Sequence, residues 1–88
     1  MPSHFAKMVD DAVREQLLAM GLEYADVVER IDLSRDHDGC VIRMAGEIEN
    51  IDVIPTEDDP TPAGVRLLVR RKLEIALRGI DPFKTQAF

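Results

Sequence analysis

The chain is poor in cysteine, histidine and tryptophan, and these scarcities exclude whole classes of protein. Its 88 residues include one cysteine, two histidines and no tryptophan. Because Cys40 stands alone, it cannot form an intramolecular disulfide, which excludes a disulfide-rich secreted domain. Two histidines and one cysteine are also too few for a closed zinc site with four such ligands. We therefore expect neither a metal nor a cofactor.

Long apolar runs are also missing. A helix that crosses a bilayer needs roughly 20 apolar residues, and no stretch of this sequence approaches that length. The first residues, MPSHFAKMVDD, place an acidic pair where a secretory signal needs apolar side chains. These features predict a cytoplasmic protein that does not contact a membrane.

The small size of the chain favours oligomerisation. A domain of this length buries only about two-thirds of the surface that its unfolded chain exposes. Small domains are usually stabilised further by disulfides, a metal or association with other chains. Since the first two are excluded by composition, we expect a homodimer.

Charge is distributed unevenly along the chain. The net charge is −6, but residues 1–60 carry 15 acidic and 5 basic side chains, whereas residues 61–88 carry 6 basic and 2 acidic ones. Such segregation indicates that one part of the chain packs against the other, within or between protomers, or that the helix surfaces simply differ.

Two segments have the apolar periodicity of helices. Residues 4–20 follow a possible N-cap at Ser3, stop at Gly21, and gather seven apolar side chains on one face: Phe5, Met8, Val9, Ala12, Val13, Leu17 and Met20. Residues 62–78 follow an N-cap at Thr61 and stop at Gly79. The core stripe of this second helix is Val65, Val69, Leu73, Ala76, Leu77 and Ile80.

Between the helices, three runs alternate with the period of half-buried strands, at 27–34, 40–48 and 51–54. A four-residue turn at 36–39 would pair three sets of apolar side chains: Leu33 with Ile42, Ile31 with Met44, and Val27 with Ile48. It would also set Asp32 opposite Arg43. A two-residue Asp38-Gly39 turn would preserve the faces but place Glu29 opposite Ile48.

The same turn has some features of a calcium loop. With Gly39 at the sixth position of an EF-hand loop, Asp36 and Asp38 fall at ligand positions. However, Ser34 is then a weak first ligand, and Ala45 stands where the bidentate glutamate is required. We therefore interpret the segment as a hairpin turn.

Together these elements predict an α+β fold with the order α-β-β-(β)-α. An antiparallel meander packs against two helices in a single domain over residues 1–80, followed by a tail over 81–88.

The helix predicted over residues 62–78 is apolar over an unusually wide arc, because three side chains lie partly or wholly outside its core stripe: Leu67, Leu68 and Ile75. Phe83 and Phe88 add apolar surface in the tail. We expect these five residues to form an interface, although the homodimer could form through this helix or through an edge strand of the small sheet, and the tail could also fold back on its own core. We expect the protein to be a non-catalytic interaction module that binds another protein as an adaptor, assembly or regulatory subunit.

Two alternatives depend on charge. Four arginines of the second helix could contact phosphates, which predicts a nucleic-acid-binding dimer: Arg66, Arg70, Arg71 and Arg78. Conversely, the acidic runs at 47–49 and 57–59 could imitate nucleic acid and inhibit a nucleic-acid-binding partner. Enzymatic activity is not expected. Cys40 and His37 are close in sequence, but the alternation places Cys40 on the inward face, where cysteines are usually inert.

Overall fold

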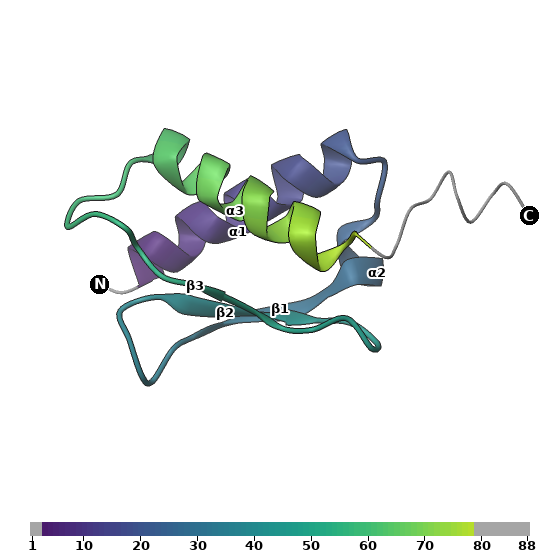
Figure 1. Cartoon of the computed structure of the whole chain (residues 1–88), viewed down its shortest axis with the longest axis horizontal. Helices are drawn as coiled ribbons and strands as arrows, with labels where there is room; N and C mark the ends of the chain where they lie inside the picture. Colours follow the sequence, from purple (N-terminus) through teal and green to yellow (C-terminus); the bar gives the residue numbers. More distant parts are fainter. Residues whose placement is uncertain (1–2, 79–88) are drawn as a thin grey trace, which may run out of the picture.

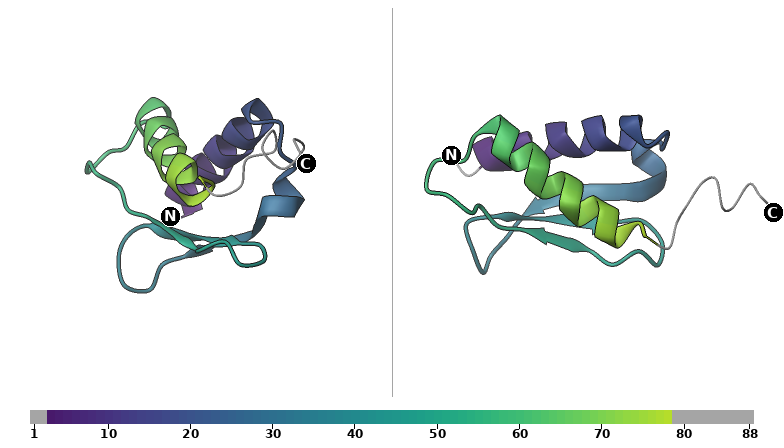
Figure 2. Two further views of the ribbon diagram at one scale, coloured as in Figure 1. Left: turned by 45° about the vertical axis from the view of Figure 1, so that its right-hand side comes forward. Right: turned by 45° about the horizontal axis from the view of Figure 1, so that its top comes forward.

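A computed structural model describes residues 3–78, which form three helices and three strands. In chain order these are α1 (Ser3–Ala19), α2 (Tyr24–Val27), β1 (Val28–Leu33), β2 (Cys40–Met44), β3 (Ile51–Val53) and α3 (Pro62–Ala76). The strands form one antiparallel sheet in the order β1-β2-β3. Helices α1 and α3 pack against each other on one face of this sheet (Figures 1 and 2). The predicted α+β meander covered by two helices is confirmed.

Helix α1 buries the face that its periodicity predicts. Val9, Val13 and Leu17 are almost completely buried, while Met8 and Met20 lie partly exposed at the margins of the core. Gly21 follows the helix with a φ of +76°, a left-handed conformation that glycine adopts without steric cost. None of the three helices in the described part of the chain has the length and apolar character that crossing a bilayer requires.

Helix α3 begins at its predicted cap. The Thr61 side-chain oxygen accepts a hydrogen bond from the Gly64 N–H at 3.1 Å, and Pro62 occupies the first helical position, where its missing N–H has no consequence. The predicted stripe is confirmed by the buried side chains Val65, Val69, Leu73 and Leu77, with Ala76 partly buried. Ile80 and the tail 81–88 lie outside the described residues.

A short helix that was not predicted precedes the sheet and includes the first residue of the predicted strand over 27–34. Residues Tyr24–Val27 form one helical turn, so β1 begins at Val28 and the predicted strand start at residue 27 is wrong. The Tyr24 hydroxyl donates a hydrogen bond to Asp10 at 3.0 Å, and the Arg14 guanidinium lies 4.0 Å from the centre of its ring. Arg14 also contacts Asp10 at 3.0 Å, as its spacing predicts. These contacts attach α2 to α1, and a single turn is too short to show a periodicity.

This arrangement gives the tyrosine an unusual titration. Burial, followed by the hydrogen bond to Asp10, raises the pKa of Tyr24 to about 12 from its usual 10.0. A raised folded-state pKa stabilises the fold at pH values below the unfolded pKa, and this contribution is lost as the pH rises from about 10 to about 12. Since Tyr24 is the only tyrosine and tryptophan is absent, tyrosinate absorbance reports it directly. We expect Asp10→Asn to lower this pKa while leaving it above 10.0, because burial remains. A wild-type pKa near 10 would contradict the contact.

The hairpin between β1 and β2 has a different register from either prediction. Leu33 pairs with Cys40 and Ile31 with Ile42, whereas the four-residue turn required Leu33 opposite Ile42. The predicted pairings are wrong because the loop spans residues 34–39. In this loop the Ser34 N–H donates to the Gly39 carbonyl at 3.1 Å. Between Arg30 and Leu33 the register differs from the prediction by an even number of residues, so these side chains keep their predicted faces. Val28 does not: it lies beyond the bulge and is buried, although the alternation predicted it on the outward face.

Asp32 and Arg43 nevertheless meet. Asp32 lies directly opposite Val41, and Arg30 lies opposite Arg43 in the same register. A bulge between Val28 and Arg30 shifts the pairing only beyond this point, where Val28 lies opposite Met44. The Asp32 carboxylate accepts hydrogen bonds from both arginines, at 3.0 Å from Arg30 and 3.1 Å from Arg43. These bonds hold the pKa of Asp32 below its usual value. The predicted attraction is therefore present as a diagonal contact on the open face of the sheet.

Strand β2 ends earlier than predicted. It stops at Met44, not at residue 48, because Gly46 adopts a φ of +62° and turns the chain. The Asn50 side-chain oxygen accepts a hydrogen bond from the Met44 N–H at 2.8 Å and closes the turn. The connection between β2 and β3 therefore spans residues 45–50, and the predicted strand end at residue 48 is wrong. Strand β3 ends at Val53, which leaves Ile54 exposed beyond it.

Candidate functional site

The outer side of α3 carries the apolar side chains that the core does not use. Leu67 is 60% exposed and Ile75 is 65% exposed. They are eight positions apart, and Arg71 lies halfway between them, so the three side chains follow one side of the helix. We call Leu67, Arg71 and Ile75 the α3 ridge.

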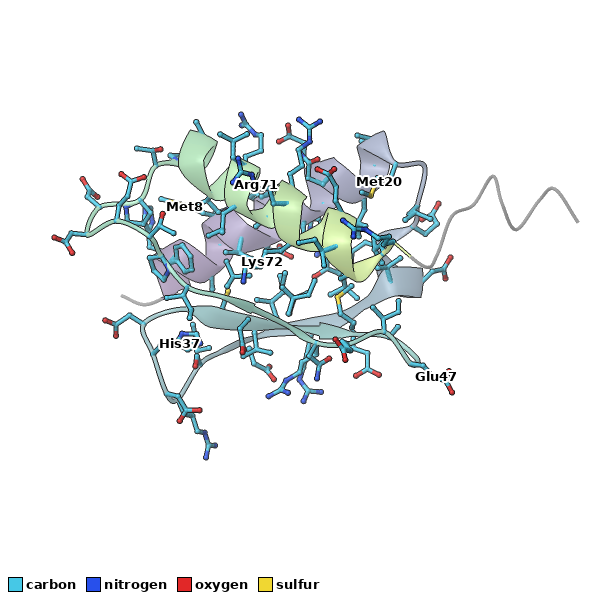
Figure 3. The ribbon with its side chains drawn as sticks, in the orientation of Figure 1. Met8, Met20, His37, Glu47, Arg71 and Lys72 are labelled. Carbon is cyan, nitrogen blue, oxygen red and sulfur yellow. The ribbon has the colours of Figure 1, made fainter. Side chains whose placement is uncertain are left out.

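A groove of about 1030 Å³ lies beside the ridge, between α3 and β3 with the turn that precedes β3. Its apolar lining comes from Ile48, Ile51, Leu68 and Ile75. Its charged lining is basic on α3, at Arg71 and Lys72, and acidic in the turn, at Glu47 and Glu49. Asp52 borders the groove at the edge of β3, with its side chain on the face away from the helices. Figure 3 shows Lys72 in the space between α3 and the sheet and Glu47 at the tip of the turn. We refer to this feature as the α3–β3 groove.

The structure divides the predicted apolar interface into two parts. Leu67 and Ile75 belong to the α3 ridge, whereas Leu68 is partly buried against the core and lines the α3–β3 groove. Ile75 belongs to both surfaces. Phe83 and Phe88 lie outside the described residues.

The four predicted arginines are not equivalent. Arg66 contacts Glu15 of α1 at 3.2 Å, and Arg70 contacts Glu74 one turn along α3 at 3.3 Å. Arg71 lines the groove and Arg78 is exposed just after α3. The structure therefore places Arg71 beside a cation that sequence analysis did not select, Lys72, whose only sequence signal is its spacing of four residues from Leu68.

Cys40 and His37 do not combine into a reactive pair. Cys40 is fully buried, as its parity predicts, and burial raises the pKa of its thiol to about 11. The thiol is therefore protonated at neutral pH, whereas a nucleophile must be a thiolate. The His37 Nδ1 accepts a hydrogen bond from the Gly39 N–H at 2.9 Å and so supports the loop. Within residues 3–78, no three or more His, Cys, Asp or Glu side chains gather in a way that could hold a metal ion.

Comparison of the chain with models of protein families, with curated proteins and with solved structures finds no match.

Proposed function

We propose that this protein is a non-catalytic interaction module that acts as a homodimer, with the α3 ridge as the contact between the two copies. The observation that supports this proposal is the exposure of Leu67 and Ile75 on one side of a helix whose other side is buried. Burial of apolar surface is the main favourable term in association. The other large apolar side chains that are exposed within residues 3–78 are Leu18 on α1, Leu33 on β1 and Ile54 beyond the end of β3, so no two of them share a helix or strand. The ridge therefore offers the most continuous apolar contact.

A two-fold axis across α3 would make this contact antiparallel. Leu67 would then lie against Ile75 of the partner subunit, because an isologous interface pairs each residue reciprocally. Antiparallel helices also place their opposite dipole ends together. Arg71 would meet Arg71 of the partner subunit at the axis, so its aliphatic stem adds apolar contact while the two guanidinium groups repel each other.

This repulsion gives the proposed dimer an unusual response to salt. Salt screens exposed charges, since the Debye length falls from about 10 Å at 0.1 M to about 3 Å at 1 M ionic strength. We expect the dimer dissociation constant, measured by sedimentation equilibrium, to decrease as salt is raised. Arg71→Gln should weaken the salt dependence, whereas Arg35→Gln, which changes an exposed loop arginine, should not. Dissociation of the dimer at high salt would contradict a contact between like-charged ridges.

Nucleic-acid binding is the second candidate, because α3 presents basic side chains. Among the described residues, Arg71, Lys72 and Arg78 form no ion pair with a carboxylate. Phosphate contacts release counterions, so such a complex weakens as salt is raised, opposite to the proposed dimer. Absorbance at the nucleic-acid maximum is a sensitive check, since the chain has one tyrosine and no tryptophan. Purified protein that carries nucleic acid and loses it in high salt would favour this candidate.

A further inference from the structure

Strand β3 has an open edge whose hydrogen-bonding groups can be identified. It pairs with β2 on one side only. The Ser34–Gly39 hydrogen bond shows that Gly39, and by alternation Val41 and Arg43, direct their backbone groups toward β1. Their neighbours Cys40 and Ile42 therefore face β3, where they pair with Val53 and Ile51. It follows that the backbone N–H and C=O of Asp52 point to the open edge.

A strand added at this edge would lie in the α3–β3 groove. Successive side chains of a strand point to opposite faces, so every second side chain of the added strand would point toward α3. There it would meet the apolar side chains Leu68 and Ile75 and the cations Arg71 and Lys72. No carboxylate within residues 3–78 forms an ion pair with either cation. The inward positions near Leu68 and Ile75 are thus suited to apolar side chains, and those near Arg71 and Lys72 to acidic ones. Glu47 and Glu49 of the preceding turn disfavour an acidic side chain near that turn.

Asp52 determines which side chain is favoured at the outward position opposite it in the added strand. The Asp52 side chain is exposed and lies on the face of the sheet away from the helices. Like charges directly opposite each other across two strands are destabilising. Antiparallel pairing of β3 with β3 of a second copy about Asp52 would place two carboxylates together, so this edge is protected from self-pairing. A basic side chain opposite Asp52 is favoured instead.

We propose that the α3–β3 groove binds an extended segment of another protein, which adds to β3 as a fourth strand. Its inward side chains are apolar and acidic, and its outward side chain opposite Asp52 is basic. This inference rests on the proposed role of the protein as an interaction module, and it names the partner by its chemistry. Strand addition of this kind takes its affinity from main-chain hydrogen bonds and its specificity from pockets for alternate side chains. Because Ile75 also belongs to the α3 ridge, the segment is expected to compete with the second copy for this side chain.

Two peptides of identical composition test the inference. Acetylated and amidated Thr-Val-Lys-Glu-Thr-Val presents valine and glutamate inward and lysine outward, while Thr-Val-Glu-Lys-Thr-Val exchanges the two charges. Each is titrated into the ¹⁵N-labelled full chain, and amide shifts are followed by NMR. We expect the first peptide to shift the amides of Asp52, Leu68 and Ile75 and to bind about tenfold more tightly than the second, since its charges complement the site. In Lys72→Glu, we expect this preference to be reduced or reversed.

Several outcomes would overturn the inference. Equal affinities for the two peptides would contradict recognition by Asp52 and Lys72, and shifts confined to Leu67 would place binding on the ridge. Contacts from residues 79–88 to Leu68 in the peptide-free chain would identify the occupant as the chain's own segment. A chain that is dimeric but binds neither peptide contradicts this inference and leaves the proposed function intact. A chain that binds the first peptide but is monomeric at every concentration contradicts the homodimer and supports the groove.

Discussion

Gly39→Ala is expected to lower the free energy of unfolding by about 3 kcal/mol, at the upper end of the usual cost of overpacking. A Cβ atom at this position would lie 2.0 Å from the Val53 carbonyl oxygen and 2.8 Å from Nδ1 of His37. The Val53 oxygen is part of the backbone, so the methyl group can be accommodated only if β2 and β3 move apart. Domains of this size have stabilities of roughly 4–13 kcal/mol, so the change removes a large fraction of the total. Thermal unfolding should show a decrease in Tm of roughly 12–24 °C.

Gly64→Ala is the matched control. Gly64 lies in the first turn of α3, where an added Cβ would be 3.3 Å from the Thr61 side-chain oxygen, a close contact with a side chain that can adjust. Alanine also has a helix propensity about 1 kcal/mol better than that of glycine. We expect the stability of this variant to lie within about 1 kcal/mol of the wild type. If Gly39→Ala were equally harmless, the close approach of the 34–39 loop to β3 would be wrong.

Leu67→Lys and Ile75→Lys are each expected to raise the dimer dissociation constant on the order of a thousandfold. A two-fold interface contains each substitution twice, and the loss of one central apolar contact costs about 2 kcal/mol, so the dimer loses about 4 kcal/mol. Lysine is preferable to aspartate here because a carboxylate could pair with Arg71 of the partner subunit. Both side chains are exposed in the single copy, so we expect circular dichroism to show a folded monomer.

Leu18→Lys is the control for the ridge variants. Leu18 is 80% exposed and lies on α1, outside the ridge, so we expect this variant to remain dimeric in light-scattering measurements. Leu68 is unsuitable for the same test, because it packs against the core and a charge there would also destabilise the single copy. If Leu67→Lys and Ile75→Lys were dimeric at the wild-type affinity, the ridge would not be the interface.

The two long helices, α1 and α3, were predictable from the sequence because each repeats its apolar pattern over several turns, whereas the single turn of α2 was not. α1 and α3 contain 17 and 15 residues, enough for the stripe through Val9, Val13 and Leu17 to be distinguished from the exposed face. The alternation of side chains along the strands was equally informative, since it correctly predicted that Cys40 faces the core. The alternation along a strand shows only which face of the sheet a side chain occupies, however, and not which residue lies opposite it on the neighbouring strand. The register is set by the 34–39 loop and by the bulge in β1, neither of which has a period.

Of the candidate site, the exposed apolar residues of α3 could be predicted from the sequence, whereas the groove could not, because it depends on contacts between distant segments. Leu67 and Ile75 could be recognised as surplus apolar residues because they deviate from a local pattern. The groove is formed by residues 47–52 and 68–76, which only the packing of α3 over β3 brings together. The turn that supplies Glu47 depends on the positive φ of Gly46 and on the Asn50 side chain. Sequence periodicity therefore indicated the surplus apolar side chains of α3 but not the groove beside them.

The most direct test of the α3 contact is an isotope-filtered nuclear Overhauser measurement on a one-to-one mixture of labelled and unlabelled copies. We expect signals between the Leu67 methyl groups of one copy and the Ile75 methyl groups of the other, because the antiparallel ridges place these side chains together. Signals that join the copies only through strand edges, or no such signals at concentrations where light scattering detects a dimer, would contradict the proposed interface.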